Sequence, residues 1–244
     1  MELRGKVALV TGGAVRVGRA LTLALAEAGC NVFIHYGRSA APAQQTQSDA
    51  SGLGVEAAIY SANLADPQAA QGVVPAAIEQ FGRIDILVNS AAIFPEEDTF
   101  TSADLTLWDR LFGVNLRAPF LLSQAFAAQL QPEGQGKIIN VLDARLREAA
   151  PDHFVYRLTK GGLWNMTEML AYELAPRITV NAVALGAILP PPGADISYLE
   201  NMAHTQVPLK RPGSPEIVAE NVLHLLRQDF LTGVVIPIDG GQFL

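Results

Sequence analysis

Short runs of β-branched and aliphatic residues alternate along the chain with longer Ala- and Leu-rich stretches, in which apolar residues recur at helical spacing. This alternation is typical of a parallel sheet, because two parallel neighbours must be joined by a long crossover, usually a helix. It predicts an α/β fold with a doubly wound parallel sheet. The predicted strands are residues 7–10, 32–35, 55–60, 84–88, 137–141, 178–183 and 233–236, and the predicted helices are residues 16–28, 41–52, 67–81, 104–130, 155–174 and 215–227.

The 244 residues are predicted to form one domain, since they contain no repeat of fixed period and no flexible linker between two halves. The segment 185–206 departs from the regular alternation, because Pro190-Pro191-Pro192-Gly193 interrupts any helix or strand. We expect this segment to be a loop with a short helix that closes over a substrate. Ligands of parallel sheets bind at the carboxyl ends of the strands, so functional residues are expected directly after them.

Composition excludes several classes of protein. Half of the residues are hydrophobic and 17% are charged, which excludes a disordered chain, and the net charge of −7 argues against nucleic acid or an anionic membrane as a partner. Without a long apolar stretch or a leader-like start, the chain is expected to be cytoplasmic. The single cysteine, Cys30, excludes an internal disulfide, and His153 and His204 lack partners at metal-ligand spacing, so no metal is expected.

A glycine-rich turn, Thr11–Gly18, connects the first strand to the first helix. Backbone N–H groups of such a turn and the positive end of the helix can bind a pyrophosphate, although glycines after a strand also occur in ordinary turns. Arg38 and Ser39 follow the second strand, where NAD-binding proteins carry an acidic residue. A guanidinium and a hydroxyl suit the 2′-phosphate of NADP(H) instead, so this cofactor is predicted; the alternative for Arg38 is a solvated surface charge.

Tyr156 and Lys160 lie four residues apart in a predicted helix, so their side chains share one face. An ammonium beside a phenol lowers the pKa of the phenol, which suits a proton donor during hydride transfer. Such a pair is also common on ordinary amphipathic helices. Its position after the fifth predicted strand favours the catalytic interpretation.

Together these motifs resemble those of the short-chain dehydrogenase/reductase family over essentially the whole chain. The motifs that carry the resemblance are the cofactor loop Thr11–Gly18, Asn89-Ser90-Ala91-Ala92 in place of Asn-Asn-Ala-Gly, Asn115, the pair Tyr156 and Lys160, Pro208-Leu209-Lys210-Arg211-Pro212-Gly213, and Asp239-Gly240-Gly241. The resemblance implies a single Rossmann-type domain with seven parallel strands in the order 3-2-1-4-5-6-7, and a homotetramer. It also implies that Asn115 holds a relay water and that Lys160 holds the nicotinamide ribose.

Four positions depart from the general pattern of the family. Arg16 replaces a glycine, Asn63 an aspartate, Leu185 a proline and Asp143 the catalytic serine. Arg16 and Asp143 resemble the signature of the pteridine reductases, as do His35-Tyr36-Gly37-Arg38-Ser39-Ala40 and Ile93-Phe94-Pro95.

The resemblance to pteridine reductases implies that Arg16 reaches cofactor phosphate and substrate, that Phe94 stacks on a pterin, and that Asp143 works with Tyr156. A carboxyl group suits the reduction of a ring C=N bond, because it can bind the amidine-like edge of a pterin or supply a proton. The alternative is that Asp143 only caps the chain or pairs with Arg145 or Arg147. Ala92 replaces a serine that touches substrate in that subfamily.

The sequence therefore predicts an NADPH-dependent reductase of a small-molecule dihydropterin or dihydrofolate. The alternatives are a carbonyl reductase of the 3-oxoacyl-acyl-carrier-protein or small-ketone type, and a dinucleotide-sensing scaffold without activity. The predicted catalytic residues are Asn115, Asp143, Tyr156 and Lys160, and the predicted substrate contacts are Arg16, Phe94, Asp143 and Tyr156. The predicted cofactor contacts are Gly12, Arg16, Val17, Gly18, His35, Tyr36, Arg38, Ser39, Asn63, Leu64, Asn89, Ser90, Ala91, Tyr156, Lys160 and Ile188.

Overall fold

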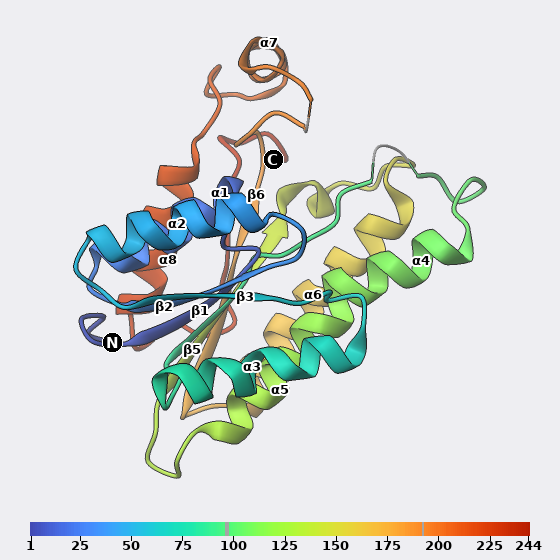
Figure 1. Ribbon diagram of the computed structural model, residues 1–244. Coiled ribbons are helices and arrows are strands. Elements are labelled where there is room, and N and C mark those ends of the chain that lie inside the picture. Colours follow the sequence, from blue (N-terminus) through green and yellow to red (C-terminus); the bar gives the residue numbers. More distant parts are fainter. Residues whose placement is uncertain (96–97, 192) are drawn as a thin grey trace.

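The computed structural model describes residues 1–95, 98–191 and 193–244. These residues contain a seven-stranded parallel sheet in the order β3-β2-β1-β4-β5-β6-β7, with helices on both faces (Figure 1). The predicted fold class and strand order are confirmed, and the strand ends differ from the predicted ones by two residues at most. The strands are β1 (Val7–Thr11), β2 (Asn31–Tyr36), β3 (Ala57–Ser61), β4 (Ile86–Asn89), β5 (Gly136–Asp143), β6 (Ile178–Leu185) and β7 (Val235–Ile238).

Helices cover both faces of the sheet. Figure 1 shows α1, α2 and α8 on one face and α3, α5 and α6 on the other. The helices are α1 (Arg16–Glu27), α2 (Ala40–Gly52), α3 (Pro67–Phe81), α4 (Leu105–Phe112), α5 (Ala118–Gln129), α6 (Phe154–Glu173), α7 (Ile196–Gln206) and α8 (Pro215–Arg227), with a π-helical turn η1 (Gly113–Arg117) and a 3₁₀ turn η2 (Ala144–Arg147). None of the helices in the described part of the chain is long and apolar enough to cross a membrane.

The central strands are apolar on both faces because both faces are covered. In β1, Ala8 and Val10 pack into the core on the side of α1 and α8, whereas Leu9 between them packs into the core on the opposite side. Side chains of a strand alternate between its two faces, so a continuous apolar run is what a fully covered strand needs. This explains why the strands appear in the sequence as unbroken aliphatic runs.

The helix predicted over residues 104–130 is not one regular α-helix. It consists of α4 and α5 joined by η1, whose wider turn carries the buried side chain of Asn115. π-helical turns occur often at functional sites, because they place a side chain where a regular helix would not. The hydrophobic pattern continues through the turn, so periodicity alone could not show the interruption.

The segment 185–206 begins at the end of β6 and contains α7. Asp195 caps this helix, accepting a hydrogen bond of 3.1 Å from the backbone N–H of Tyr198. Leu199 and Ala203 anchor it in a small apolar cluster, and Figure 1 shows it at one end of the sheet, apart from both helical layers. The prediction of a loop with a short helix agrees with this arrangement, except for Pro192, which lies outside the described residues.

Candidate active site

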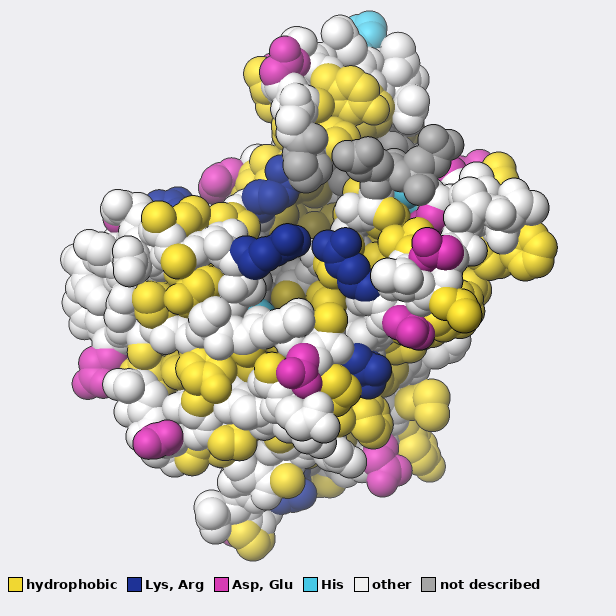
Figure 2. All heavy atoms as spheres, turned by 45° about the vertical axis from the view of Figure 1, so that its right-hand side comes forward, with side chains coloured by type: hydrophobic (Ala, Val, Ile, Leu, Met, Phe, Trp, Pro, Cys, Tyr) yellow, Lys and Arg dark blue, Asp and Glu magenta, His cyan; other side chains and the backbone are white. Residues whose placement is uncertain are grey.

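A cavity of about 860 Å³ lies at the carboxyl ends of the strands, as expected for a parallel sheet. Figure 2 shows Lys and Arg side chains gathered around a hollow on this side of the protein. The basic residues that line the cavity are Arg16, Arg38, Arg110 and Lys160. Of the predicted cofactor contacts, those that line it are Gly12, Arg16, Val17, Gly18, His35, Tyr36, Arg38, Ser39, Asn63, Leu64, Ser90, Ala91, Tyr156 and Lys160.

The glycine-rich turn has the shape of a phosphate cradle. Gly12 has a φ of +64°, and a Cβ there would lie 3.0 Å from the Cα of Ala91, while a Cβ on Gly18 would overlap the carbonyl oxygen of Gly12. Only glycine fits both positions without a shift of the backbone. Val15, which precedes α1, has no side-chain acceptor to cap the helix, so the first N–H groups are open to an anion. The turn therefore fits a dinucleotide pyrophosphate.

His35 supports this turn from the end of β2. Its Nδ1 accepts a hydrogen bond of 3.2 Å from the N–H of Gly12, and its Nε2 lies 3.0 Å from the carbonyl oxygen of Ala62. Burial lowers the pKa of His35, which favours the neutral ring with its proton on Nε2. His35 lines the cavity, as expected for a cofactor contact, and its hydrogen bond with Gly12 supports the glycine-rich turn.

Two predicted cofactor contacts, Asn89 and Ile188, do not line the cavity. The side chain of Asn89 lies inside the protein, where its Nδ2 donates to Oδ1 of Asn140 over 2.9 Å and links β4 to β5. Ile188 is 5% exposed and packs into the core under the loop after β6. Both residues lie at the predicted end of the sheet and their side chains support neighbouring elements, while their contacts with the cofactor, which near Ile188 are expected from the backbone, stay predictions.

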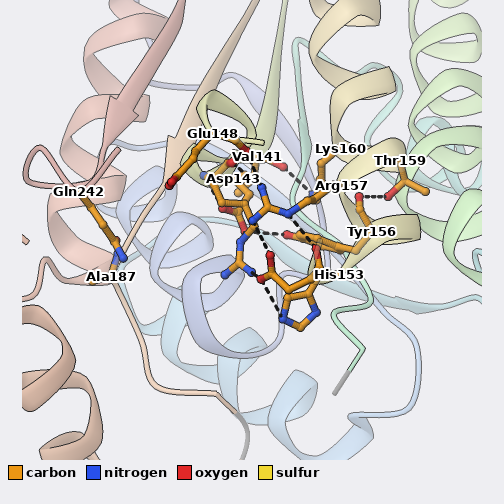
Figure 3. A network of polar contacts seen from close by, with 12 residues as sticks. Val141, Asp143, Glu148, His153, Tyr156, Arg157, Thr159, Lys160, Ala187 and Gln242 are labelled. Atoms are coloured by element: carbon orange, nitrogen blue, oxygen red, sulfur yellow. Dashed lines mark hydrogen bonds and ion pairs between the residues drawn. The ribbon is translucent and has the colours of Figure 1, made fainter. Parts of the chain in front are cut away.

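Tyr156 and Asp143 meet at the end of β5 (Figure 3). The phenol of Tyr156 donates a hydrogen bond of 3.1 Å to Oδ2 of Asp143. Asp143 also caps η2, because its Oδ1 accepts from the N–H of Arg145 over 2.9 Å, and its Oδ2 pairs with Nε of Arg145 over 3.0 Å. The contacts named by both interpretations of Asp143 are thus present: one carboxylate contacts the tyrosine and also caps and pairs with the following turn.

The side chain of Lys160 is buried and donates a hydrogen bond of 2.8 Å to the carbonyl oxygen of Val141. Burial lowers the pKa of Lys160 to about 8. Burial also raises the pKa of Tyr156, and the negative charge of Asp143 raises it further, while the positive charge of Arg145 opposes these effects. The expected lowering of the Tyr156 pKa by Lys160 is therefore wrong for this geometry, in which burial and a carboxylate dominate.

Asn115 connects three elements around the site. Its Oδ1 accepts from the N–H of Ile93 over 2.8 Å, and its Nδ2 donates to the carbonyl oxygen of Ile93 over 2.9 Å. Nδ2 also lies 3.3 Å from Oγ1 of Thr159, which in turn donates to the carbonyl oxygen of Tyr156 over 2.7 Å. The turn η1 thereby ties the segment after β4 to α6, which accounts for the break in the long helix.

Phe94 forms an aromatic platform beside Tyr156. Its ring is 40% exposed and meets the ring of Tyr156 edge-on, with the ring centroids 4.9 Å apart. The ring of His153 lies 4.4 Å away between centroids, and Cζ of Arg145 lies 5.0 Å from the centroid of Phe94. The sequence predicted no role for His153, and for Arg145 it offered a pairing with Asp143 but no contact with Phe94, because both residues fall in an irregular segment without a pattern.

Arg16 lines the cavity and also contacts the loop after β6. Its Nη2 donates a hydrogen bond of 2.7 Å to the carbonyl oxygen of Pro190, so it joins the start of α1 to the loop after β6. Its φ of +53° is the left-handed conformation that favours glycine, the residue expected at this position from the family pattern. Arg110 from α4 lines the cavity as well, and sequence reasoning missed it because it lies within a long helical pattern.

Comparisons with known proteins identify the family. A sequence model of the family described as "Enoyl-(Acyl carrier protein) reductase" matches residues 13–242. The 3-oxoacyl-[acyl-carrier-protein] reductase FabG of Staphylococcus aureus is 33% identical over 243 residues, covering 98% of both chains. The chain belongs to the short-chain dehydrogenase/reductase family. An L-rhamnose 1-dehydrogenase (NAD(P)(+)) of a Sphingomonas species is 32% identical over 250 residues, so relatives of different specificity are similarly close to this short-chain dehydrogenase/reductase.

Solved structures of other short-chain dehydrogenases/reductases match the whole fold. FolM alternative dihydrofolate reductase 1 from Brucella canis, complexed with NADP, has a TM-score of 0.92 at 34% identity and covers 100% of this chain and 96% of its own. A short-chain dehydrogenase from Burkholderia cenocepacia, also in complex with NADP, has a TM-score of 0.91 at 32% identity. The protein is an NADP-dependent oxidoreductase of this family, and the phosphate cradle and basic residues of its cavity fit that cofactor.

Proposed function

We propose that this enzyme uses NADPH to reduce a ring C=N bond of a dihydropterin or dihydrofolate. The observation that carries the proposal is the hydrogen bond between Tyr156 and Asp143, next to the half-exposed ring of Phe94. A carboxylate and a phenol that line the cavity, and an aromatic ring that contacts the phenol, are thus available side by side. They match the hydrogen-bonding edge, the reacting nitrogen and the flat face of a pterin.

NADPH supplies the hydride, so the protein must position the pterin and deliver a proton to the ring nitrogen. In the proposed mechanism Tyr156 donates this proton, and its raised pKa keeps the phenol protonated until transfer. Asp143 binds the amidine-like edge of the substrate or returns a proton to Tyr156. Lys160 holds the nicotinamide ribose, and Asn115 positions the water that restores the proton from solvent.

The remaining predicted contacts are assigned to the phosphates and the adenine of the cofactor. The turn Gly12–Gly18 and Arg16 are proposed to hold the pyrophosphate, with N–H groups and one guanidinium as donors. Arg38 and Ser39 are proposed to hold the 2′-phosphate at the start of α2. The adenine is assigned to the part of the cavity lined by Asn63 and Leu64.

A second candidate function is the reduction of a carbonyl group in a 3-oxoacyl thioester or a small ketone. The similarity to FabG favours it, because 33% identity extends over 98% of both chains. The presence of Tyr156 and Lys160 is compatible with either substrate. Asp143 favours the pterin, since a carbonyl substrate needs an orienting hydroxyl at this position more than a carboxylate.

A substrate screen with Asp143→Ser tests the proposal. NADPH oxidation is followed with dihydrobiopterin, dihydromonapterin and dihydrofolate, and separately with an acetoacetyl thioester and a small ketone. Asp143→Ser should reduce pterin turnover about 100-fold or more, as expected for a lost proton-transfer partner, and leave carbonyl turnover largely unchanged. Glu148→Ser, which removes an exposed carboxylate from the same segment, is the matched control. Equal losses for both substrate classes, or turnover of carbonyls alone, would contradict the proposal.

We also propose a homotetramer. Trp108 and Phe112 in α4 stack on each other with their ring centroids 4.4 Å apart, and Leu105 in α4 and Phe120 in α5 are 79% and 46% exposed. Large exposed apolar side chains that lie together are typical of subunit contacts. Light scattering of the purified protein gives the mass directly, and Trp108→Glu should shift it to a smaller species.

A further inference from the structure

Arg145 occupies the contacts that the proposed function assigns to the substrate. Its Nε lies 3.0 Å from Oδ2 of Asp143, and its Cζ lies 5.0 Å from the ring centroid of Phe94. One guanidinium thus pairs with the carboxylate and covers part of the aromatic platform. The substrate therefore competes with a side chain of the protein for these two contacts.

The two competitors are chemically alike. The pyrimidine half of a pterin contains a planar N–C(–NH₂)–N unit, which is a guanidine built into a ring. Such a unit donates parallel hydrogen bonds to a carboxylate and stacks on an aromatic face, as the guanidinium of an arginine does. Arg145 therefore imitates the part of the substrate that Asp143 and Phe94 are proposed to recognise.

We propose that Arg145 is a specificity-determining gate. Its side chain moves away from Asp143 and Phe94 only when a ligand takes over both the ion pair with the carboxylate and the contact with the aromatic ring. This inference rests on the proposed function. A dihydropterin satisfies the carboxylate and the aromatic ring when Arg145 departs. A ketone or thioester has no paired donors, so displacement would leave the half-buried charge of Asp143 without its partner, which is unfavourable.

The backbone around Arg145 is fixed, so the gate opens by rotation of one side chain. The N–H of Arg145 donates to Oδ1 of Asp143 over 2.9 Å, and its carbonyl oxygen accepts from Nη1 of Arg157 over 2.6 Å. The side chain itself is 24% exposed. Its Nη1 already lies 3.7 Å from Oδ2 of Asp152, whose side chain is 45% exposed. A displaced guanidinium can stay paired with Asp152 at the surface while η2 keeps its place.

The test compares Arg145→Met with Arg147→Met. Methionine keeps an apolar stem of similar length and removes the guanidinium, and Arg147 is an exposed arginine in the same turn, so its variant is the matched control. Calorimetry measures binding of isocytosine, the pyrimidine half of a pterin without a reducible ring bond, to each protein saturated with NADPH. A pyrimidin-4-one without the 2-amino group is the control ligand.

Arg145→Met should bind isocytosine about three- to tenfold more tightly than the parent, because the ligand no longer displaces an ion pair and a cation–π contact. Arg147→Met should bind like the parent, and the ligand without the amino group should not distinguish the proteins. The KM for a dihydropterin should fall by a similar factor in Arg145→Met, and the KM for a ketone should stay constant. A purely structural role would raise the KM values of both substrates.

Unchanged or weaker binding of isocytosine by Arg145→Met overturns the gate, whatever substrates the enzyme reduces. If Arg145→Met binds isocytosine more tightly but no variant turns over a dihydropterin, the gate is supported and the proposed function is refuted. Circular dichroism and NADPH binding establish that each variant is folded. Arg145→Gln, with the same expected result, replaces the methionine variant if that variant does not fold.

Discussion

Replacing Arg38 by alanine should remove most of the preference for NADPH over NADH. Arg38 and Ser39 line the cavity just beyond the end of β2, and Ser39 precedes the first turn of α2. The hydroxyl of Ser39 makes no capping hydrogen bond, so it is available to a ligand together with the N–H groups of that turn. A 2′-phosphate at this point meets a guanidinium, a hydroxyl and the positive end of a helix.

The size of the effect follows from the exposure of Arg38. A hydrogen bond to a charged group contributes about 1.5–3 kcal/mol, and the lower part of this range applies because the side chain is exposed and screened by solvent. A loss of about 1.5–2 kcal/mol corresponds to a decrease of roughly 10- to 30-fold in kcat/KM for NADPH. The value for NADH, which lacks the 2′-phosphate, should stay within about twofold of the parent.

Steady-state kinetics with both cofactors, at low and at high ionic strength, measure this preference. The difference between Arg38→Ala and the parent should shrink as salt is added, because an exposed contact between opposite charges is screened. Arg177→Ala, which removes an exposed arginine outside the cavity, is the control. An equal decrease for NADPH and NADH, or an unchanged preference, would refute the assignment of Arg38 to the 2′-phosphate.

Four further substitutions test the site and its scaffold. Tyr156→Phe should lower kcat/KM about 10²- to 10⁴-fold while NADPH fluorescence still shows cofactor binding; a smaller loss would argue for another proton donor. Burial lowers the pKa of Lys160 from 10.5 to about 8, so between these pH values the Lys160 amine is protonated in the unfolded chain but not in the folded one. The free energy of unfolding therefore rises with pH across this window. Lys160→Met should therefore be more stable than the parent near neutrality, by about 3 kcal/mol at most. Urea denaturation should show this difference in the free energy of unfolding vanish towards pH 10.5, and a difference that stays constant with pH would contradict the reasoning. Gly18→Ala should abolish NADPH binding because its Cβ overlaps the carbonyl oxygen of Gly12, whereas Gly161→Ala, with open space around it in α6, should gain about 0.5–1 kcal/mol in thermal unfolding.

The fold was predictable because local patterns and the covered sheet agree. Strands such as β1 are buried on both faces and therefore appear as continuous aliphatic runs, and the crossovers between them are long enough only for helices. The interruption at η1 was not predictable from periodicity. It depends on the amide of Asn115 binding the backbone of Ile93, a contact 22 residues away in sequence.

The position of candidate site residues was predictable where they directly follow a strand. The glycine turn, Arg38 and Tyr156 all lie at the predicted edge of the sheet. The sequence did not show side-chain direction or environment: the side chain of Asn89 points to Asn140, and the pKa of Tyr156 follows its burial and Asp143 more than its helical neighbour. Such properties arise from tertiary packing, which spacing along a helix does not encode.

Under the proposed function, Asp143 lets one position change the chemistry of an otherwise common scaffold. Its Oδ1 caps the turn that follows β5, a local contact that any aspartate at the end of a strand can make without altering the fold. The cap leaves Oδ2 to the phenol of Tyr156 and to Nε of Arg145. We propose that the carboxylate thereby adds a proton-handling group at a fixed place. FabG and FolM match this chain at 33% and 34% identity, so overall similarity does not distinguish their two chemistries. Under the proposed function the carboxylate beside the tyrosine does, because it changes what the cavity can protonate.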